Sequence, residues 1–406
     1  MMQGQIRQLI NSRGKWPLIM AVILSSIFLA PLSFLSRIYQ PSLIVCLLAY
    51  CSMLRNAKLG WGELFLILAC ATSIVLGNPP AVFNSWLRLG LFCIVLIVTS
   101  PIVSSASINR FRVYLFSWIS KICVFVGVGS FFAYFLGVNY MQVYSVGQSI
   151  TLSGLFGGLT PHSMLLGPIS AFGLLRCLFL LFERHKADVM AVYYLYFGAF
   201  TCFVAVLFSA SRSAAGAALV ASCYLIYAKL KHQIGKIFKI LLCLLCLSVP
   251  LGPMIMDFSS GLLDKQNANI ESGSMFSSRE SLWNARMNEF LESPFYGVGF
   301  AALRIMNDKS TSISGQIEPG TSYGAVLSMT GIFGGIIFFY IIMAAFRRKR
   351  GEQISMPQIY LVFFLLHLFV EGYIFAGGSS LCFIFWLCIG STFAIKQTHE
   401  LSKLTL

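Results

Sequence analysis

The stretch TSYGAVLSMTGIFGGIIFFYIIMAAFRRKR, residues 321–350, decides the fold class, because an uncharged run at 321–346 ends in four consecutive basic residues. An α-helix needs about 20 apolar residues to cross the hydrocarbon core of a bilayer. Lys and Arg collect in the loops on the cytoplasmic side of a membrane. The stretch therefore predicts a transmembrane helix whose C-terminal end faces the cytoplasm.

The composition of the whole chain extends this prediction. Of the 406 residues 57% are hydrophobic and 11% are charged, and the mean hydropathy is +0.80. A soluble domain carries roughly a quarter charged residues, so this chain could not cover a surface that faces water. The net charge of +15 does not indicate nucleic-acid binding, because the basic residues lie in short clusters between apolar runs.

We predict an all-α polytopic membrane protein with about twelve transmembrane helices. Each predicted span is an apolar run of roughly the length that a bilayer requires. The spans are 16–36, 38–54, 59–77, 86–107, 113–137, 163–182, 189–209, 212–229, 237–256, 321–345, 357–376 and 378–395.

The loops between these spans alternate in charge. Loops after odd-numbered spans carry almost no Lys or Arg, apart from Arg37 and one large loop. Both termini and the loops after even-numbered spans are basic, which places them in the cytoplasm of a bacterial inner-membrane protein. The basic loops read RNAK at 55–58, NRFR at 109–112, ERHK at 183–186, KLKHQIGK at 229–236 and RRKR at 347–350.

The large loop, residues 257–320, lies between spans nine and ten and is predicted to be periplasmic. It divides the chain into spans one to nine (1–256), the loop, and spans ten to twelve with a cytoplasmic tail (321–406). Within it, residues 277–292 place apolar side chains at helical spacing after a serine, which predicts an amphipathic helix. Its apolar positions are Leu282, Ala285, Met287, Phe290 and Leu291.

The twelve cysteines all fall inside apolar runs. Cys243 and Cys246 form a CxxC, but their surroundings, LLCLLCLSV, lack the polar partners that a metal site needs. The outer loops contain no Asp-x-Asp pair either, so we expect neither a metal nor a cofactor.

Several charges fall within or beside predicted spans, where an ionised side chain costs about 2.5–3.5 kcal/mol at the bilayer centre. Glu63, Lys121 and Arg176 lie toward cytoplasmic helix ends, where long side chains can extend to the head groups. Arg88 and Arg212 lie instead at the outer ends of spans four and eight. The guanidinium group binds phosphate oxygens in a bidentate manner, so both residues suit a diphosphate.

Span eleven carries Glu371 about one and a half turns below its outer end, with His367 one turn deeper on the same face. Together with the outer arginines, these residues predict a polar site where the large loop meets the membrane. The alternative is intramembrane pairing for packing alone, for instance between Arg88 and Glu371.

Three segments resemble the bacterial O-antigen polymerase and O-antigen ligase family in their order and spacing. They are SASRSAAG at 209–216, RESLWNARMNEFLESPFYGVG at 279–299 and EPGTSYGAVLSMTGIFGG at 318–335. The resemblance covers about 190–345 and implies a membrane glycosyltransferase of the GT-C-like class. Such an enzyme transfers a glycan from undecaprenyl diphosphate to an acceptor hydroxyl at the periplasmic face of the inner membrane. The acceptor is the next lipid-linked repeat unit in a polymerase and lipid A-core in a ligase.

We assign Arg212 and Arg279 to stabilisation of the diphosphate leaving group, and we take Glu318, two residues before Gly320, as the first choice of general base. The ligase-type His of the third segment corresponds to Gly320 here, which favours a polymerase, and Glu371 and His162 remain alternative bases. Trp283 and Tyr323 could stack on sugar rings or pack within the protein. We therefore assign substrate binding to Arg88, Arg286, Glu371, His162, Trp283 and Tyr323.

The expected partners are the bilayer, an undecaprenyl-diphosphate-linked oligosaccharide and, as a further candidate, a chain-length regulator protein, but not nucleic acid. Two other classes compete with the enzyme. A flippase or transporter should show two related halves with matching broken helices, whereas this chain has one large loop in its second half alone. A structural or assembly membrane protein would have no use for the arginine-bearing segments.

Overall fold

The computed structural model describes residues 15–51, 57–141, 156–183, 189–231, 233, 235, 279–304, 319–348 and 352–404. Among these residues eight helices are long and apolar enough to cross a membrane, and three shorter apolar helices accompany them. Each of these helices overlaps a predicted span, but the predicted span 16–36 is divided, because a short helix ends at Ser25 and residues 30–36 belong to the next helical segment. The predicted span 237–256 lies outside the described residues. The structure therefore confirms an all-α polytopic membrane fold.

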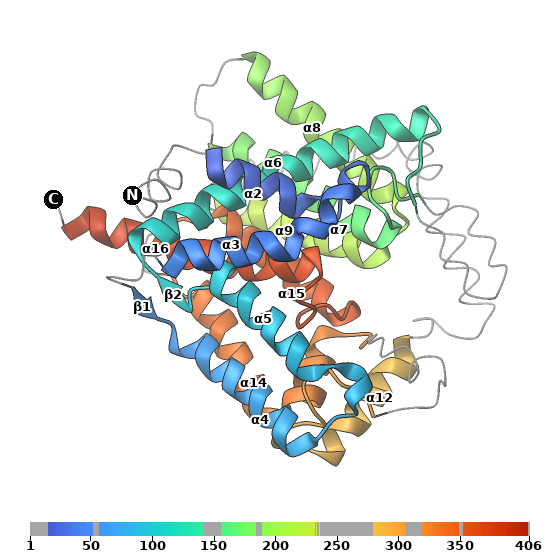
Figure 1. Cartoon of the computed structure of the whole chain (residues 1–406). Helices are drawn as coiled ribbons and strands as arrows, with labels where there is room; N and C mark the ends of the chain where they lie inside the picture. The colour runs from blue at the N-terminus through green and yellow to red at the C-terminus, as the bar shows by residue number, and fades with distance from the viewer. Residues whose placement is uncertain are drawn as a thin grey trace. The chain divides into compact units, whose positions relative to one another are not determined.

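Figure 1 shows the arrangement of these elements, which are almost entirely helical. Their bounds are α2 Lys15–Ser25, η1 Ala30–Ile38, α3 Tyr39–Cys51, β1 Lys58–Leu59, α4 Trp61–Gly77, η3 Ala81–Phe83, α5 Ser85–Thr99, β2 Val103–Ser104, α6 Ala106–Phe135, α7 Ser163–Glu183, α8 Val189–Phe208, α9 Arg212–Leu230, α12 Arg279–Glu292, α14 Ser322–Phe346, α15 Met356–Val370 and α16 Ser380–Leu404.

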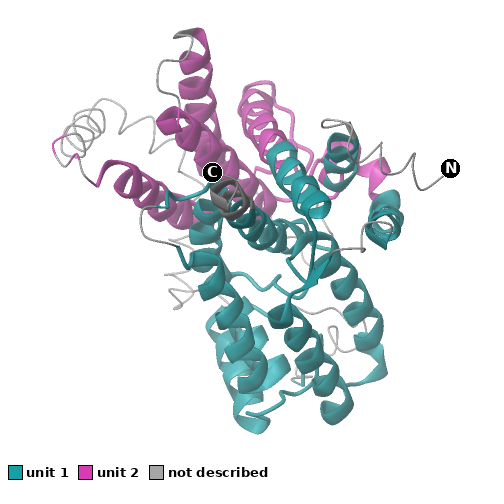
Figure 2. Ribbon diagram, turned by 90° about the vertical axis from the view of Figure 1, so that its left-hand side faces the viewer, with its two compact units in different colours: residues 1–24, 37–118, 276–406 teal, residues 25–36, 119–275 magenta. Residues whose placement is uncertain are grey.

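The contacts divide the chain into two compact units, coloured separately in Figure 2. Unit 1 contains residues 1–24, 37–118 and 276–406, and unit 2 contains residues 25–36 and 119–275. Each unit is described by itself below. The division into 1–256, 257–320 and 321–406, which follows membrane topology, stays a prediction.

Two basic residues of unit 1 cap helix ends. Arg112 is fully buried and donates hydrogen bonds to the carbonyl oxygens of Ile97 (2.8 Å), Val98 (3.1 Å) and Val103 (2.9 Å) at and beyond the end of α5. Lys396 donates to Ala345 (2.9 Å) near the end of α14. The last carbonyls of a helix have no partner within it and carry partial negative charge, so a cation satisfies them.

The structure corrects the prediction for the residues around Arg112. The basic cluster NRFR at 109–112, expected to be a loop, lies inside the 30-residue helix α6. The turn before α6 is closed instead by the antiparallel pair of β1 and β2, in which Lys58 lies opposite Ser104.

Helix α14 is broken in its middle at Gly331, where φ is 65° and ψ is −168°. The turn that follows α12 fills the break: the Ile332 amide donates to the Pro294 carbonyl and the Val298 amide donates to the Ser328 carbonyl, both at 2.8 Å. Backbone groups inside a membrane must find partners within the protein. At the break, backbone hydrogen bonds therefore connect SPFYGVG (293–299) to SMTGIFGG (328–335), which are the ends of the second and third family-like segments.

In unit 2, small residues bring helices close together. A Cβ atom on Gly167 of α7 would lie 2.8 Å from the Cβ of Ala214 and 2.9 Å from that of Ser211. Helices in membranes associate through such small residues, so the small side chains around Arg212 have a packing role. The cysteines among the described residues form no disulfide with one another, and most of them are buried.

Candidate active site

Three segments that are distant in the sequence meet at one end of unit 1. They are the start of α12, residues 319–322 leading into α14, and the end of α15. The Thr321 hydroxyl donates to the Leu368 carbonyl (3.2 Å), and the Ser322 hydroxyl donates to the Glu371 carbonyl (2.6 Å). These hydrogen bonds tie the third family-like segment to span eleven.

Arg279, the first residue of α12, connects all three segments. Its Nη2 lies 2.6 Å from Oε1 of Glu371, and its Nη1 donates to the carbonyls of Gly320 (3.2 Å) and Val370. Both charged side chains remain partly exposed, at 20% for Arg279 and 16% for Glu371. The structure thus brings together two predicted site residues, one from the large loop and one from span eleven.

The position of Glu371 corrects the sequence-based prediction. Helix α15 ends at Val370, and Glu371 is its C-cap with extended backbone angles (φ −128°, ψ 135°) rather than an interior helical residue. The end falls here because the Ser322 hydroxyl, besides donating to Glu371, accepts a hydrogen bond from the Tyr373 amide at 3.1 Å. One side chain therefore satisfies two backbone groups that the helix would otherwise have paired.

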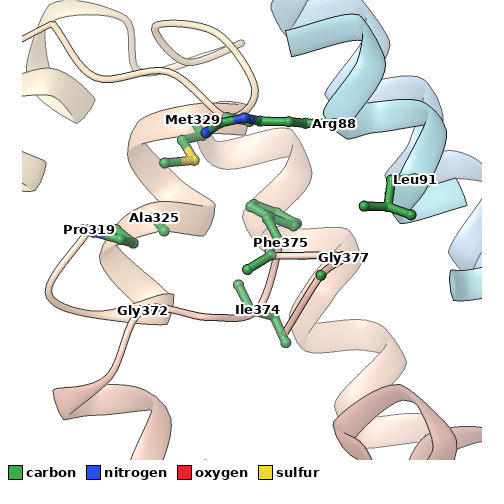
Figure 3. Close-up of a pocket in the computed structure, with 12 residues that line it drawn as sticks. Arg88, Leu91, Pro319, Ala325, Met329, Gly372, Ile374, Phe375 and Gly377 are labelled. Atoms are coloured by element: carbon green, nitrogen blue, oxygen red, sulfur yellow. The ribbon is translucent and has the colours of Figure 1, made fainter. Parts of the chain in front are cut away.

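A cavity of about 280 Å³ lies beside this junction (Figure 3). Figure 3 shows Arg88 reaching from α5 toward Met329 of α14. Pro319 and Gly372 line the cavity, and their chain neighbours Gly320 and Glu371 hold Arg279. The lining residues are Arg88, Leu91, Ala301, Pro319, Ala325, Met329, Gly372, Ile374, Phe375, Ala376, Gly377 and Gly378.

The cavity is lined almost entirely by uncharged residues. Arg88 is the one ionisable residue among the described residues that line the cavity. The rest of the wall is apolar side chains and glycine, which leaves backbone amides and carbonyls within reach of a ligand. A cation set in an apolar cavity is suited to an anionic head group attached to a hydrophobic chain.

Helix α12 is confirmed at Arg279–Glu292, but its buried face is not the predicted apolar one. Arg286 and Glu289 face inward as an ion pair at 2.8 Å, with side chains 3% and 1% exposed, while Met287 and Leu291 are exposed. Glu289 also accepts a hydrogen bond from the Arg304 amide at 2.8 Å. The opposite charges of the pair offset part of the cost of burying this polar side. Burial lowers the pKa of Arg286, which Glu289 partly offsets.

Gly320 adopts a left-handed conformation (φ +71°), and a Cβ atom there would lie 2.6 Å from the Cβ of Leu282 in α12. A histidine at this position would need both an unfavourable backbone conformation and a displaced α12. Glu318, the predicted general base, lies outside the described residues. Its role stays a prediction.

Two other predicted site residues lie in unit 2. Arg212 is the first residue of α9, after Ser211, whose hydroxyl accepts from the Ala214 amide at 3.4 Å as the N-cap. His162 occupies the equivalent position before α7, where its Nδ1 accepts from the Met164 amide at 3.1 Å. Arg212 thus begins a helix and His162 immediately precedes one, and the exposed amides at helix N-termini favour anions.

The predicted aromatic residues lie on two helices. Tyr323 donates its hydroxyl to the Leu365 carbonyl (2.8 Å) and its ring lies parallel to that of Phe339 at 5.7 Å, so it packs α14 against α15. Trp283 lies half-buried on α12. Stacking of either ring on a sugar stays a prediction.

Sequence reasoning missed Ser322, Ser73 and Gly331. Ser73 of α4 donates to the Met329 carbonyl freed by the break in α14. The glycine-rich stretch GIFGG was a signal for the break, whereas nothing local to Ser73 or Ser322 indicated their distant partners.

These features define a polytopic α-helical membrane protein. Its cavity is lined by Arg88 and lies where α12 meets the broken helix α14 and the C-terminal end of α15. Residues 197–339 match the family model described as O-Antigen ligase. This match covers about a third of the chain, supports a relationship to the O-antigen ligase and polymerase family, and does not distinguish the two activities. It runs from α8 through α9 and α12 into α14, and so includes Arg212, Arg279 and the break at Gly331. No curated protein matches the chain.

Proposed function

We propose that this protein is a repeat-unit polymerase that transfers a glycan from undecaprenyl diphosphate onto another lipid-linked repeat unit. The cavity lined by Arg88, which lies beside the Arg279–Glu371 ion pair, carries the proposal. It offers one cationic side chain for a diphosphate and apolar walls for the lipid attached to it. The family match supports a glycosyltransferase-type enzyme acting on lipid-linked glycans.

In the proposed reaction the acceptor hydroxyl oxygen attacks the anomeric carbon of the donor glycan. The new C–O bond forms as the bond to the diphosphate breaks, and undecaprenyl diphosphate leaves with the bonding electrons. Arg88 and Arg279 stabilise the negative charge on the leaving group, and the role of Arg212 stays a prediction from the sequence. A carboxylate, Glu318 or Glu371, takes the proton of the acceptor hydroxyl.

The Arg279–Glu371 pair suggests how the donor engages the site. Arg279 already uses both terminal nitrogens in contacts with Glu371 and with the carbonyls of Gly320 and Val370. A bound diphosphate would take the place of Glu371 on the guanidinium. The carboxylate released by this exchange could then accept the proton, so donor binding would prepare the base.

Ligation is the second candidate, because the matching family model carries that description. Gly320 weighs against it: the position of the ligase-type His is a left-handed glycine packed on Leu282. A chain-length regulator partner, cytoplasmic termini and a periplasmic site in the bacterial inner membrane complete the proposal.

Deletion of the gene in its host, followed by analysis of surface and lipid-linked glycans, tests this function. Loss of a polymerase leaves single repeat units on the normal acceptor. Loss of a ligase leaves full-length chains on the lipid carrier, and loss of a flippase traps the unit inside the cell. Complementation with Arg88→Ala or Arg279→Ala should fail to restore long chains, and normal chains in both variants would refute the site.

A further inference from the structure

Unit 2 contains a second cavity, of about 340 Å³, between α6, α7 and α8. Two cations from different helices, Lys121 of α6 and Arg176 of α7, face it together. Apart from Tyr194, the other lining residues are apolar. The lining residues are Lys121, Val124, Arg176, Cys177, Leu180, Ala191, Tyr194 and Leu195.

The arginine of this cavity is held in position. Nη1 of Arg176 donates to the Ser120 hydroxyl at 2.6 Å, and Ser120 immediately precedes Lys121 on α6. One side chain contact thus sets the guanidinium beside the helix that carries the lysine. The sequence indicated two separate cations extending toward the head groups, whereas the structure puts both on one cavity.

The described residues that line the cavity include two cations and no carboxylate. Glu183, at the end of α7, forms an ion pair with Lys229 of α9. Two like charges in a mainly apolar cavity repel each other, and an anion between them would remove that repulsion.

The cavity also lies close to the ends of the helices that form it. Arg176 lies seven residues before the end of α7, and Ala191 and Leu195 lie in the first two turns of α8. At a rise of 1.5 Å per residue, the cavity is about 5–10 Å from these helix ends. Tyr194 lines the cavity, and Tyr193 and Tyr196 are exposed near it in the sequence of α8; tyrosine is enriched at membrane interfaces.

We propose that this cavity binds the phosphate of an anionic glycerophospholipid, with Arg176 and Lys121 on the phosphate and the acyl chains along Leu180 and Leu195. Basic pockets between transmembrane helices near their cytoplasmic ends bind such head groups. The basic loops predict that this end of the helices is cytoplasmic. The apolar wall favours a lipid over free phosphate. The inference is independent of the proposed enzymatic function.

The test uses the full chain purified in detergent, with a mixture of phosphatidylglycerol and phosphatidylcholine as the probe. Lipids retained by the protein are counted by native mass spectrometry. Lys121→Gln removes one cation with little risk to folding, because Lys121 is exposed; Arg176→Gln removes the other. Lys231→Gln is the matched control, because it removes an exposed cation just beyond α9 and outside the cavity.

We expect the wild-type protein and Lys231→Gln to retain phosphatidylglycerol in preference to phosphatidylcholine. Lys121→Gln and Arg176→Gln should each weaken that retention about tenfold, the effect of losing one charge-assisted contact. Leu180→Trp, which fills the cavity without changing charge, should weaken it as well. Unchanged retention in a monodisperse Lys121→Gln protein would overturn the proposal, as would displacement of the lipid by millimolar inorganic phosphate.

Discussion

Arg279 of α12 and Glu371 at the end of α15 form an ion pair with 2.6 Å between Nη2 and Oε1, across 92 residues of sequence. The pair joins the large loop to a membrane span beside the Arg88 cavity. We proposed that a bound diphosphate replaces Glu371 on the guanidinium of Arg279. Substitution of Arg279 and substitution of Glu371 should then have different effects on activity.

Replacing Arg279 tests the cationic side of the pair. Arg279→Ala should lower polymerisation at least 100-fold, because a donor to the leaving-group charge is lost. Arg279→Lys should retain part of the activity, since it keeps the charge but loses the planar fork. Chain length of the surface glycan in a complemented deletion strain provides the measurement. The control is Arg304→Ala, which removes an exposed arginine paired with Glu292; equal activity in all variants would contradict this role.

The structural contribution of the pair can be measured separately. A double-mutant cycle with Arg279→Ala and Glu371→Ala should give a coupling of about 1–2 kcal/mol, intermediate between exposed and buried ion pairs. Thermal unfolding of the four proteins in detergent supplies the values. Additive losses would mean that the contact contributes nothing to stability.

The break in α14 predicts an intolerant glycine. Gly331→Ala should destabilise the protein by more than about 2 kcal/mol, because φ is positive and the Phe295 carbonyl occupies the place of a Cβ atom. Gly90→Ala in α5 is the matched control, since nothing lies within 4 Å of its Cβ position. Folded yield and unfolding temperature distinguish the two variants. A Gly331→Ala protein as stable as Gly90→Ala would contradict the close packing of the turn after α12 against the break in α14.

Gly320 offers a test of the departure from the ligase pattern. Gly320→His should lower folded yield and produce no ligation, because the side chain must displace Leu282 from its contact with the loop. Gly320→Ala should show a smaller loss of the same kind. Transfer of glycan to lipid A-core by the Gly320→His variant would show that the position is open to a base.

The capping role of Arg112 predicts a large effect on stability far from the proposed site. Arg112→Met should cost about 3 kcal/mol, because it leaves buried carbonyls of α5 without a charged donor. Arg110→Met, two residues away and exposed, should change stability by less than about 0.5 kcal/mol. Equal unfolding temperatures for the two variants would show that the carbonyls find other partners.

The sequence alone was enough to predict the all-α membrane fold and the approximate positions of the eight described helices that are long enough to span a membrane. Apolar length and basic loops are local properties, so each could be read without knowing what a helix packs against. The family-like segments were also readable, and the match over residues 197–339 confirms them.

The tertiary structure decided which polar groups meet. It paired Arg279 with Glu371, turned Arg286 and Glu289 of α12 inward, and buried Arg112 against carbonyls of another helix. Such partners are remote in the sequence, and a polar side chain carries no local sign of which distant group will satisfy it. Inside a membrane, water is not available to form hydrogen bonds with a polar side chain. The folded structure therefore determines whether a charged side chain caps a helix, connects two segments or binds a ligand.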